Sequence, residues 1–241
     1  ISNPIIKLNN LSFSYEDGTK ALDNINLEIE KGSLVALVGQ NGSGKSTLSK
    51  IIAGIMKPSS GTASIAGLNP MLKRERLKLP GHVSYVFQNP DHQIFTRSVR
   101  SEVGYSLKNA GITGIDAEQR IQEILERVGL KDKINEDPIF LGRGQKRRLA
   151  VASSIVIKPE ILIVDEPTTG QDYRMSIEIM KIIKRLNSEG VTVIMVTHDM
   201  RLVAEYCRRV IVMSNGTIVF DGTPESLFMD EKTLKLSALA E

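Results

Sequence analysis

One segment of the 241-residue chain constrains its fold more than any other, because it requires a strand before it and a helix after it. The segment reads Gly39-Gln40-Asn41-Gly42-Ser43-Gly44-Lys45-Ser46 and matches the pattern G-x-x-x-x-G-K-[ST]. A short apolar run at 33–38 precedes it, and a helical pattern at 45–53 follows it. Glycines allow positive φ and a close approach of backbone N–H groups to an anion, which a helix N-terminus also attracts. The segment therefore predicts a loop that binds the phosphates of a nucleoside triphosphate.

Individual residues of this loop have distinct predicted roles. Lys45 is expected to reach the β- and γ-phosphates, Ser46 to ligate Mg²⁺ through its hydroxyl, and Thr47 to lie near the α-phosphate. The backbone of the remaining loop positions is expected to surround the phosphates: Gly39, Asn41, Gly42, Ser43 and Gly44. The loop alone leaves open a GTPase, a small-molecule kinase or a helicase, although the sequence has no Asn-Lys-x-Asp element of the GTPase type.

Two acids follow a second apolar strand, at the carboxyl end where α/β folds bind their ligands. The strand is expected at 161–164, and Asp165 and Glu166 come directly after it. Asp165 is predicted to share the Mg²⁺ ion with Ser46, and Glu166 to orient or deprotonate the attacking water. His198 follows a further strand at 191–196 and is predicted to donate toward the γ-phosphate.

The order of strand and helix patterns predicts an α/β fold, a P-loop NTPase with a mostly parallel sheet. Alternating segments at 5–15 and 21–29 predict an N-terminal antiparallel β subdomain, and 217–220 is expected to pair with 210–213 in a hairpin. Residues 96–154 read as an inserted helical subdomain. The rest, 1–95 and 155–241, is expected to form a RecA-like core, so that 1–241 is one ATPase domain.

Composition excludes several other classes of protein. Hydrophobic residues make up 41% of the chain, so a disordered chain is excluded. No apolar run approaches the ~18 residues needed to span a bilayer. Cys207 is the single cysteine, so no internal disulfide can form, and a net charge of +3 does not favour a nucleic-acid partner. The start at Ile1 and the end at Glu241 leave open a longer parent protein, including one half of a tandem ATPase.

Beyond these motifs, the sequence resembles the nucleotide-binding subunits of ATP-binding-cassette (ABC) proteins along essentially its whole length. The most specific element is Leu141-Gly142-Arg143-Gly144-Gln145, which stands before the Asp-Glu strand where the family has Leu-Ser-Gly-Gly-Gln. The resemblance implies two subunits that close head to tail around two ATP molecules, each between one subunit's phosphate loop and the other's signature.

The same resemblance gives roles to residues outside the motifs above. Tyr15 falls where the family stacks an aromatic ring on adenine, and Gln88 falls in the Q-loop that senses Mg²⁺ and the attacking water. Asp172 falls in the D-loop, where the two subunits touch, and His198 is the switch histidine. ATP and Mg²⁺ are therefore the expected cofactors.

The signature departs from the family pattern at two positions. Gly142 replaces the usual Ser and Arg143 replaces the next Gly, so the hydroxyl that binds the partner's γ-phosphate is missing. Arg143 is a good phosphate ligand that could replace this hydroxyl, or it could block close approach. Because Lys45 and Glu166 are intact, we expect a heterodimer with two unequal ATP sites, with a homodimer as the alternative. The D-loop is also unusual, with Gln171 where Leu is common.

The segment Val86-Phe87-Gln88-Asn89-Pro90-Asp91-His92-Gln93-Ile94-Phe95 resembles the ATPases of energy-coupling-factor and cobalt- or nickel-type importers. That class implies import of a small solute, a vitamin or a transition-metal ion, by a complex with integral membrane subunits. The chain would then lie peripherally on the cytoplasmic face of the membrane, with Ile94 and Phe95 packed against a scaffold helix or buried in the subdomain core.

The sequence leaves other functions open. The alternatives are a soluble or tandem ABC ATPase outside transport, an ATPase of another ABC transporter class, and a nucleotide-gated module that has lost hydrolysis. The basic run Lys146-Arg147-Arg148 reads as a solvated helix face. His82 and His92 are expected to have no ligand role, and Cys207 is expected to be buried in the core or partly so.

Overall fold

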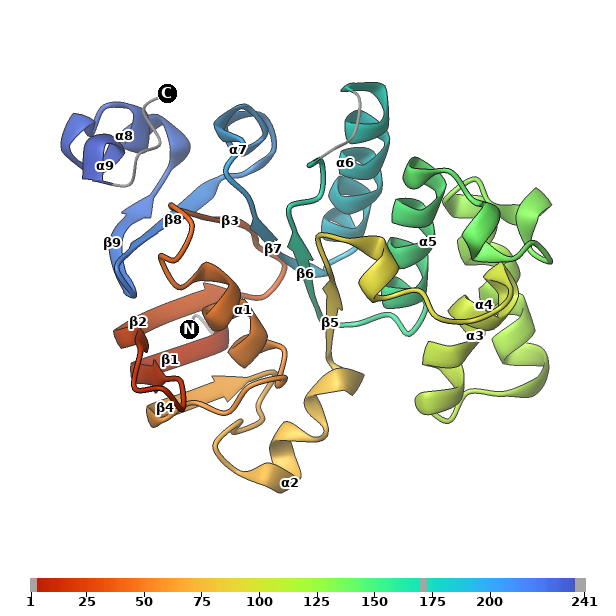
Figure 1. Ribbon diagram of the computed structural model, residues 1–241, viewed down its shortest axis with the longest axis horizontal. Coiled ribbons are helices and arrows are strands. Elements are labelled where there is room, and N and C mark those ends of the chain that lie inside the picture. The colour runs from red at the N-terminus through yellow and green to blue at the C-terminus, as the bar shows by residue number, and fades with distance from the viewer. Residues whose placement is uncertain (1–3, 170–172, 237–241) are drawn as a thin grey trace.

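A six-stranded sheet forms the centre of the computed structural model, which describes residues 4–169 and 173–236 (Figure 1). Its strand order is β5-β6-β7-β3-β8-β9, and all neighbours are parallel except β8 and β9. The strands run over Leu34–Val38 (β3), Val83–Val86 (β5), Ile161–Asp165 (β6), Thr192–Val196 (β7), Arg209–Ser214 (β8) and Thr217–Gly222 (β9). The predicted mostly parallel α/β core is therefore confirmed.

A second sheet, fully antiparallel, packs against this core. Its order is β2-β1-β4, with bounds Pro4–Ser14 (β1), Lys20–Glu30 (β2) and Ser60–Ile65 (β4). Every second residue along most of β2 is buried, including Ile25, Leu27 and Ile29, which is the period-two pattern of a sheet with one face on the core. The expected N-terminal antiparallel part is thus present.

Helices surround the sheets, and three of them gather on one side of the molecule in Figure 1. These three, α3 (Val99–Asn109), α4 (Gly114–Arg127) and α5 (Arg143–Ile155), occupy the segment predicted to be a helical subdomain. The others are α1 (Lys45–Ile52), α2 (Lys73–Arg76), α6 (Tyr173–Ser188), α7 (Met200–Tyr206), α8 (Pro224–Phe228) and α9 (Glu231–Leu236). Short 3₁₀ turns lie at Leu79–Gly81, Pro90–His92, Lys131–Lys133 and Pro138–Phe140.

The central sheet separates two apolar clusters, because successive residues of a strand face opposite sides. On β3, Ala36 and Val38 enter the cluster with α3, α5 and α6, whereas Val35 and Leu37 enter the cluster with α1 and the antiparallel sheet. The helical segment therefore shares one continuous core with the sheet. The division at 96–154 stays a prediction about the domain organisation.

Turn residues define the ends of several elements as their sequence indicates. Gly54 (φ 75°) and Gly129 (φ 67°) follow α1 and α4 and adopt the left-handed backbone that terminates helices. Asn215 and Gly216 both have positive φ, as the two-residue hairpin between β8 and β9 requires. The short helices α2, α8 and α9 were not expected, because four to six residues carry too little periodicity.

No helix of the part of the chain described above has both the length and the apolar character needed to cross a membrane.

Cys207 lies at the end of α7 with 6% of its surface exposed, so its expected burial is confirmed. Burial raises the pKa of its thiol to about 12. Because only the thiolate attacks alkylating reagents, we expect native Cys207 to react with iodoacetamide at pH 8 at least ~100-fold more slowly than in the urea-unfolded chain. Mass spectrometry of timed reactions measures this ratio, and equal rates in the two states would contradict the burial.

Candidate nucleotide site

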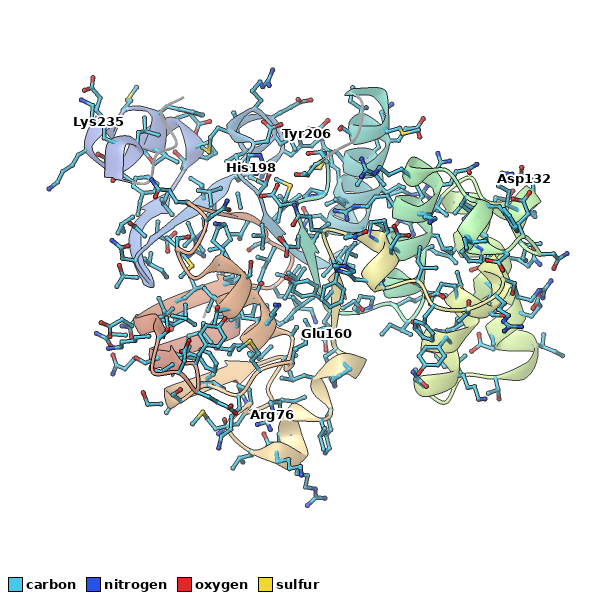
Figure 2. The ribbon with its side chains drawn as sticks, in the orientation of Figure 1. Arg76, Asp132, Glu160, His198, Tyr206 and Lys235 are labelled. Carbon is cyan, nitrogen blue, oxygen red and sulfur yellow. The ribbon has the colours of Figure 1, made fainter. Side chains whose placement is uncertain are left out.

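The ends of three neighbouring parallel strands bring the predicted residues together. The phosphate loop follows β3, Asp165 and Glu166 end β6, and His198 follows β7, and these strands are adjacent in the order β6-β7-β3. In Figure 2, His198 lies at this edge of the sheet, whereas Glu160, just before β6, lies at the opposite edge. Lys45 and Asp165 thus meet across about 120 residues of sequence because parallel strands place their carboxyl ends together.

A cavity of about 1050 Å³ opens at this edge. It is lined by nearly all of the predicted nucleotide-site residues: Tyr15, Gly39, Asn41, Gly42, Gly44, Lys45, Ser46, Thr47, Gln88, Asp165, Glu166 and His198. Ser43 is the exception, because its side chain is buried beneath the loop with 3% exposed. The volume suits a nucleotide-sized ligand.

The loop conformation depends on its glycines. Gly39 has φ 143°, and a Cβ there would lie 2.2 Å from the carbonyl oxygen of Met213, so no side chain fits. Lys45 folds back and donates to the carbonyl oxygens of Gly39 and Gln40, both at 2.7 Å. Burial lowers the pKa of Lys45, and the nearby charges of two acids oppose that shift. The ammonium therefore has an intramolecular partner within its own loop.

Tyr15 and Thr47 contact each other at the rim of the cavity. Their hydroxyl oxygens are 2.9 Å apart, and the Tyr15 ring also packs edge-on against Phe13 at 5.0 Å between centroids. The Tyr15 ring remains 43% exposed and lines the cavity, so one face can accept a planar base. Stacking on adenine stays a prediction.

Glu166 is held by hydrogen bonds in an unusual backbone conformation. Its φ is 46°, in the left-handed region that costs a non-glycine residue ~1–2 kcal/mol. Its backbone N–H donates to the Val196 carbonyl at 2.8 Å, which ties it to β7. His198 Nδ1 donates to one carboxylate oxygen at 2.7 Å, and the Thr169 hydroxyl donates to the other at 3.0 Å. The carboxylate is thus oriented toward the cavity edge, as a group that accepts a proton from water must be.

Asp165 ends β6 and, like Glu166, is half-buried. Burial raises the pKa of its carboxyl, while the hydrogen bond donated by the Tyr85 hydroxyl, at 2.9 Å, opposes the rise. Ser46, Gln88 and Asp165 offer only oxygen ligands, the type that Mg²⁺ prefers. Residues 4–169 and 173–236 contain no group of three His, Cys, Asp or Glu able to hold a metal alone. The set therefore fits a cation that one carboxylate shares with the phosphates of a ligand.

The signature residues lie apart from the phosphate-loop cavity. Leu141 is buried, while Gly142 and Arg143 are exposed at the start of α5, where Gly142 N–H donates to the Gln145 side chain at 3.0 Å. None of the set Leu141, Gly142, Arg143, Gly144 and Gln145 lines the phosphate-loop cavity, and their role toward a second molecule stays a prediction. A smaller cavity of about 380 Å³ contacts Leu141, Arg143 and also Gln88. Asp172 and Gln171 lie outside the described residues.

The basic run after the signature is not a solvated face, and that expectation is wrong for Arg147. Its surface is 2% exposed, and its guanidinium donates to the carbonyl oxygens of Phe87, Gln88, Asp165 and Glu166 at 2.5–2.9 Å. Lys146 instead pairs with Asp91, and Arg148 with Glu178, each at 2.8 Å. One buried side chain thus joins α5 to the Q-loop and to the acids at the end of β6.

The helical periodicity of α5 indicates that Arg147 is buried. Gly144, Arg147 and Val151 are buried on one face of α5, at the spacing i, i+3 and i+7. A charged residue at that period is buried only when polar partners surround it. Tyr85 and Gln93 were missed as well: the Gln93 amide donates to the Ala150 carbonyl at 2.9 Å and accepts from Phe87 N–H at 3.3 Å. Tyr85 belongs to no motif, and Gln93 lies in the segment at 86–95 whose resemblance gave this residue no role.

His82 and His92, for which no ligand role is expected, have different surroundings. His82 Nδ1 lies 2.9 Å from a Glu160 carboxylate oxygen, at the edge of the sheet opposite the cavity. His92 Nε2 lies 3.5 Å from the Asn89 side-chain nitrogen in the Q-loop turn. Neither belongs to a group that could hold a metal within the described residues.

Comparison with known proteins gives a consistent family. The family model described as ABC transporter matches residues 22–169. An energy-coupling factor transporter ATP-binding protein of Methanothermobacter thermautotrophicus is 40% identical over 98% of this chain and 76% of its own length. The structure of cbiO1 from Clostridium perfringens, described as part of the ABC transporter complex cbiONQ, superposes with a TM-score of 0.86 at 36% identity, covering 97% of this chain and 94% of its own.

A second solved structure and a longer relative extend the comparison. A dimeric ATP-binding cassette in a post-hydrolysis state with ADP and phosphate superposes with a TM-score of 0.82 at 30% identity, over 91% of this chain and 98% of its own. A Caldanaerobacter subterraneus ABC transporter ATP-binding protein is 41% identical over 95% of this chain, but the chain spans only 40% of that protein. The resemblance inferred from the signature, and the P-loop fold, are confirmed by these matches.

The buried guanidinium of Arg147 predicts a loss of stability when this residue is replaced. Replacing Arg147 by Met removes the guanidinium donor from four partly buried carbonyl oxygens, so the free energy of unfolding should fall by about 2–4 kcal/mol. Arg148→Met is the matched control, because Arg148 pairs with one partly exposed carboxylate and should lose at most ~1 kcal/mol. Urea unfolding followed by circular dichroism measures both, and equal losses would contradict the structural role of Arg147.

Proposed function

The chain belongs to the ABC transporter family of ATPases, and from this premise we propose that it hydrolyses ATP to drive import of a small solute through partner membrane subunits. The solute class we propose is a vitamin or a transition-metal ion, which is the class implied by the resemblance of residues 86–95 to energy-coupling-factor and cobalt- or nickel-type importers. One observation carries the proposal: Glu166, fixed by His198, faces the cavity that the phosphate loop and Asp165 also line.

The described residues divide the chemistry among them. Lys45 and the loop N–H groups bind the phosphates, and the oxygens of Ser46, Gln88 and Asp165 hold Mg²⁺. A cation held by these residues would neutralise negative charge on the phosphates. Glu166 accepts a proton from the attacking water, and His198 orients Glu166 through Nδ1; His198 also donates toward the γ-phosphate when Nε2 carries a proton as well. Tyr15 binds the adenine through its exposed ring face.

A second ATPase subunit completes each site in this proposal. The signature of one chain lies against the ATP of the other, and Asp172 contacts the partner near the same place. The exposed position of Gly142 and Arg143 at the start of α5 supports such a contact. Because Gly142 has no hydroxyl to offer, we propose a heterodimer with two unequal sites, in which a normal signature of the partner serves this chain's phosphate loop.

The membrane subunits are proposed to dock beside the Q-loop, which would place the chain peripherally on the cytoplasmic face of the membrane. Phe95 is 64% exposed and Tyr105 46% exposed, and their rings meet edge-on at 4.7 Å between centroids. Ile94 is half-buried and packs on the core beneath them. Two large aromatic rings at the surface suit an apolar helix of another subunit.

An alternative assembly has one specific observation in its favour. The chain spans 40% of the Caldanaerobacter relative and 43% of a Methanosarcina mazei relative that is 47% identical. A cassette within a longer ATPase would bind ATP by the same residues. Copurification with a membrane scaffold subunit and a separate partner ATPase supports the transporter proposal, whereas a parent chain with a second cassette supports the alternative.

The role of Glu166 as the base predicts that its substitution lowers ATP hydrolysis without lowering ATP binding. Glu166→Gln keeps the shape of the side chain but cannot accept the proton, so turnover should fall at least ~100-fold while ATP binding persists. Glu160→Gln, at the other end of β6, is the matched control and should keep normal turnover. Phosphate release and equilibrium binding of a fluorescent ATP analogue measure the two properties. Unchanged turnover in Glu166→Gln would show that Glu166 is not the base.

The unequal-site proposal predicts a gain of function. Gly142→Ser restores a hydroxyl at an exposed position whose φ of −64° accepts a side chain. Turnover by this chain alone should rise about tenfold, the effect of one hydrogen bond to a charged phosphate. Gly142→Ala adds the Cβ without the hydroxyl and should not rise. If the unaltered chain alone already matches the mixed complex in turnover, the two sites are not unequal.

A further inference from the structure

Tyr85 links the phosphate-loop helix to the acid at the end of β6. It lies on β5, whose register places it beside Ile163 of β6, two residues before Asp165. Residues 163 and 165 face the same side of the sheet, since side chains alternate along a strand. The α1 helix covers that side, because Ile163 and Leu48 belong to one apolar cluster.

Four oxygens form a continuous chain of contacts across this side of the sheet. The Tyr85 hydroxyl donates to Asp165 Oδ2 at 2.9 Å. The Ser49 hydroxyl oxygen lies 3.1 Å from the same Tyr85 oxygen and 3.0 Å from the Ser46 carbonyl oxygen, and since the Tyr85 proton goes to Asp165, the single Ser49 proton serves one of these two acceptors at a time. Ser49 is fully buried, and the Tyr85 ring packs against Phe87 at 4.7 Å between centroids. The phenol therefore has little freedom to move away from the carboxylate.

The contact selects one oxygen of the carboxylate. A carboxylate that ligates a cation usually has a hydrogen-bond donor on its other lone pairs, and that donor sets the direction of the ligating ones. Arg147 holds the backbone carbonyl of Asp165 at 2.9 Å, so backbone and side chain are fixed by different groups. Tyr85 acts on the side chain alone.

We propose that Tyr85 is a positioning residue that orients the Asp165 carboxylate for the divalent cation and keeps it in register with Ser46. The inference rests on the metal-ligand role of Asp165 in the proposed function. It adds a residue outside the phosphate loop, the signature and the Asp-Glu strand, and it gives Ser49 a supporting part through the Tyr85 hydroxyl.

Tyr85→Phe tests the proposal, because it removes one oxygen and keeps the ring that packs on Phe87. We expect the affinity for Mn²⁺ of the protein bound to a non-hydrolysable ATP analogue, measured by electron paramagnetic resonance, to fall about tenfold. The half-saturating Mg²⁺ concentration for ATP turnover should rise in parallel. Affinity for ATP in EDTA should stay unchanged, since the phosphate loop is untouched. Wild-type Mn²⁺ affinity in Tyr85→Phe would overturn the proposal.

Matched variants separate positioning from general damage. Ser49→Ala should weaken Mn²⁺ binding less than Tyr85→Phe, and Tyr206→Phe, which removes the same atom from a ring on α7, should leave it unchanged. If Tyr85→Phe does not fold, unchanged Mn²⁺ affinity in Ser49→Ala overturns the proposal. A loss of metal-free ATP affinity in Tyr85→Phe equal to the loss of Mn²⁺ affinity also overturns it, because a structural defect would lower both.

Asp165→Asn, measured beside these variants, distinguishes failure of the Tyr85 proposal from failure of the metal-ligand role of Asp165 on which it rests. Normal Mn²⁺ affinity in Asp165→Asn removes the metal-ligand role of Asp165 and the Tyr85 proposal with it. Lost Mn²⁺ affinity in Asp165→Asn with normal affinity in Tyr85→Phe overturns the Tyr85 proposal alone.

Discussion

Parallel hydrogen bonding among β6, β7 and β3 is the constraint on which the site depends. Each of these strands is five residues long and almost wholly buried, so its register is fixed by packing on both faces. Because the strands run in one direction, their carboxyl ends form a single edge. Each functional group lies at or just after the end of its strand, so the phosphate loop, the two acids and the histidine lie close together.

Fine positioning at that edge comes from side chains that reach across it. Arg147 fixes four carbonyl oxygens from two loops, His198 orients Glu166, and Tyr85 holds Asp165. A guanidinium suits the first task because its planar fork serves several acceptors at once, and burial strengthens each bond. Arg147 thereby joins α5, the helix that begins with the signature, to the Q-loop and to the acids. A displacement of α5 would therefore move these two segments or break their hydrogen bonds to Arg147.

The sequence was most informative where a motif specifies its own local geometry. Gly39 and Gly44 require the loop, Gly129 ends a helix, and Asn215-Gly216 makes a hairpin, all visible within a few residues. Arg147 and Tyr85 could not be placed in the same way, because their partners lie 18–80 residues away and none belongs to their own element. Local rules treated Arg147 as one of three similar charges, and only packing distinguishes it from its neighbours. The roles proposed for the signature and for Asp172 involve a second molecule, which no feature within one chain can place.

The folded-back position of Lys45 limits the free energy that an anion gains when it binds to the loop. Its ammonium already has two carbonyl partners at 2.7 Å, so an incoming anion gains only the difference between new contacts and those it displaces. A free phosphate ion, with few other contacts, gains little from such an exchange. A ligand gains from the exchange only where further groups of the loop bind it at the same time.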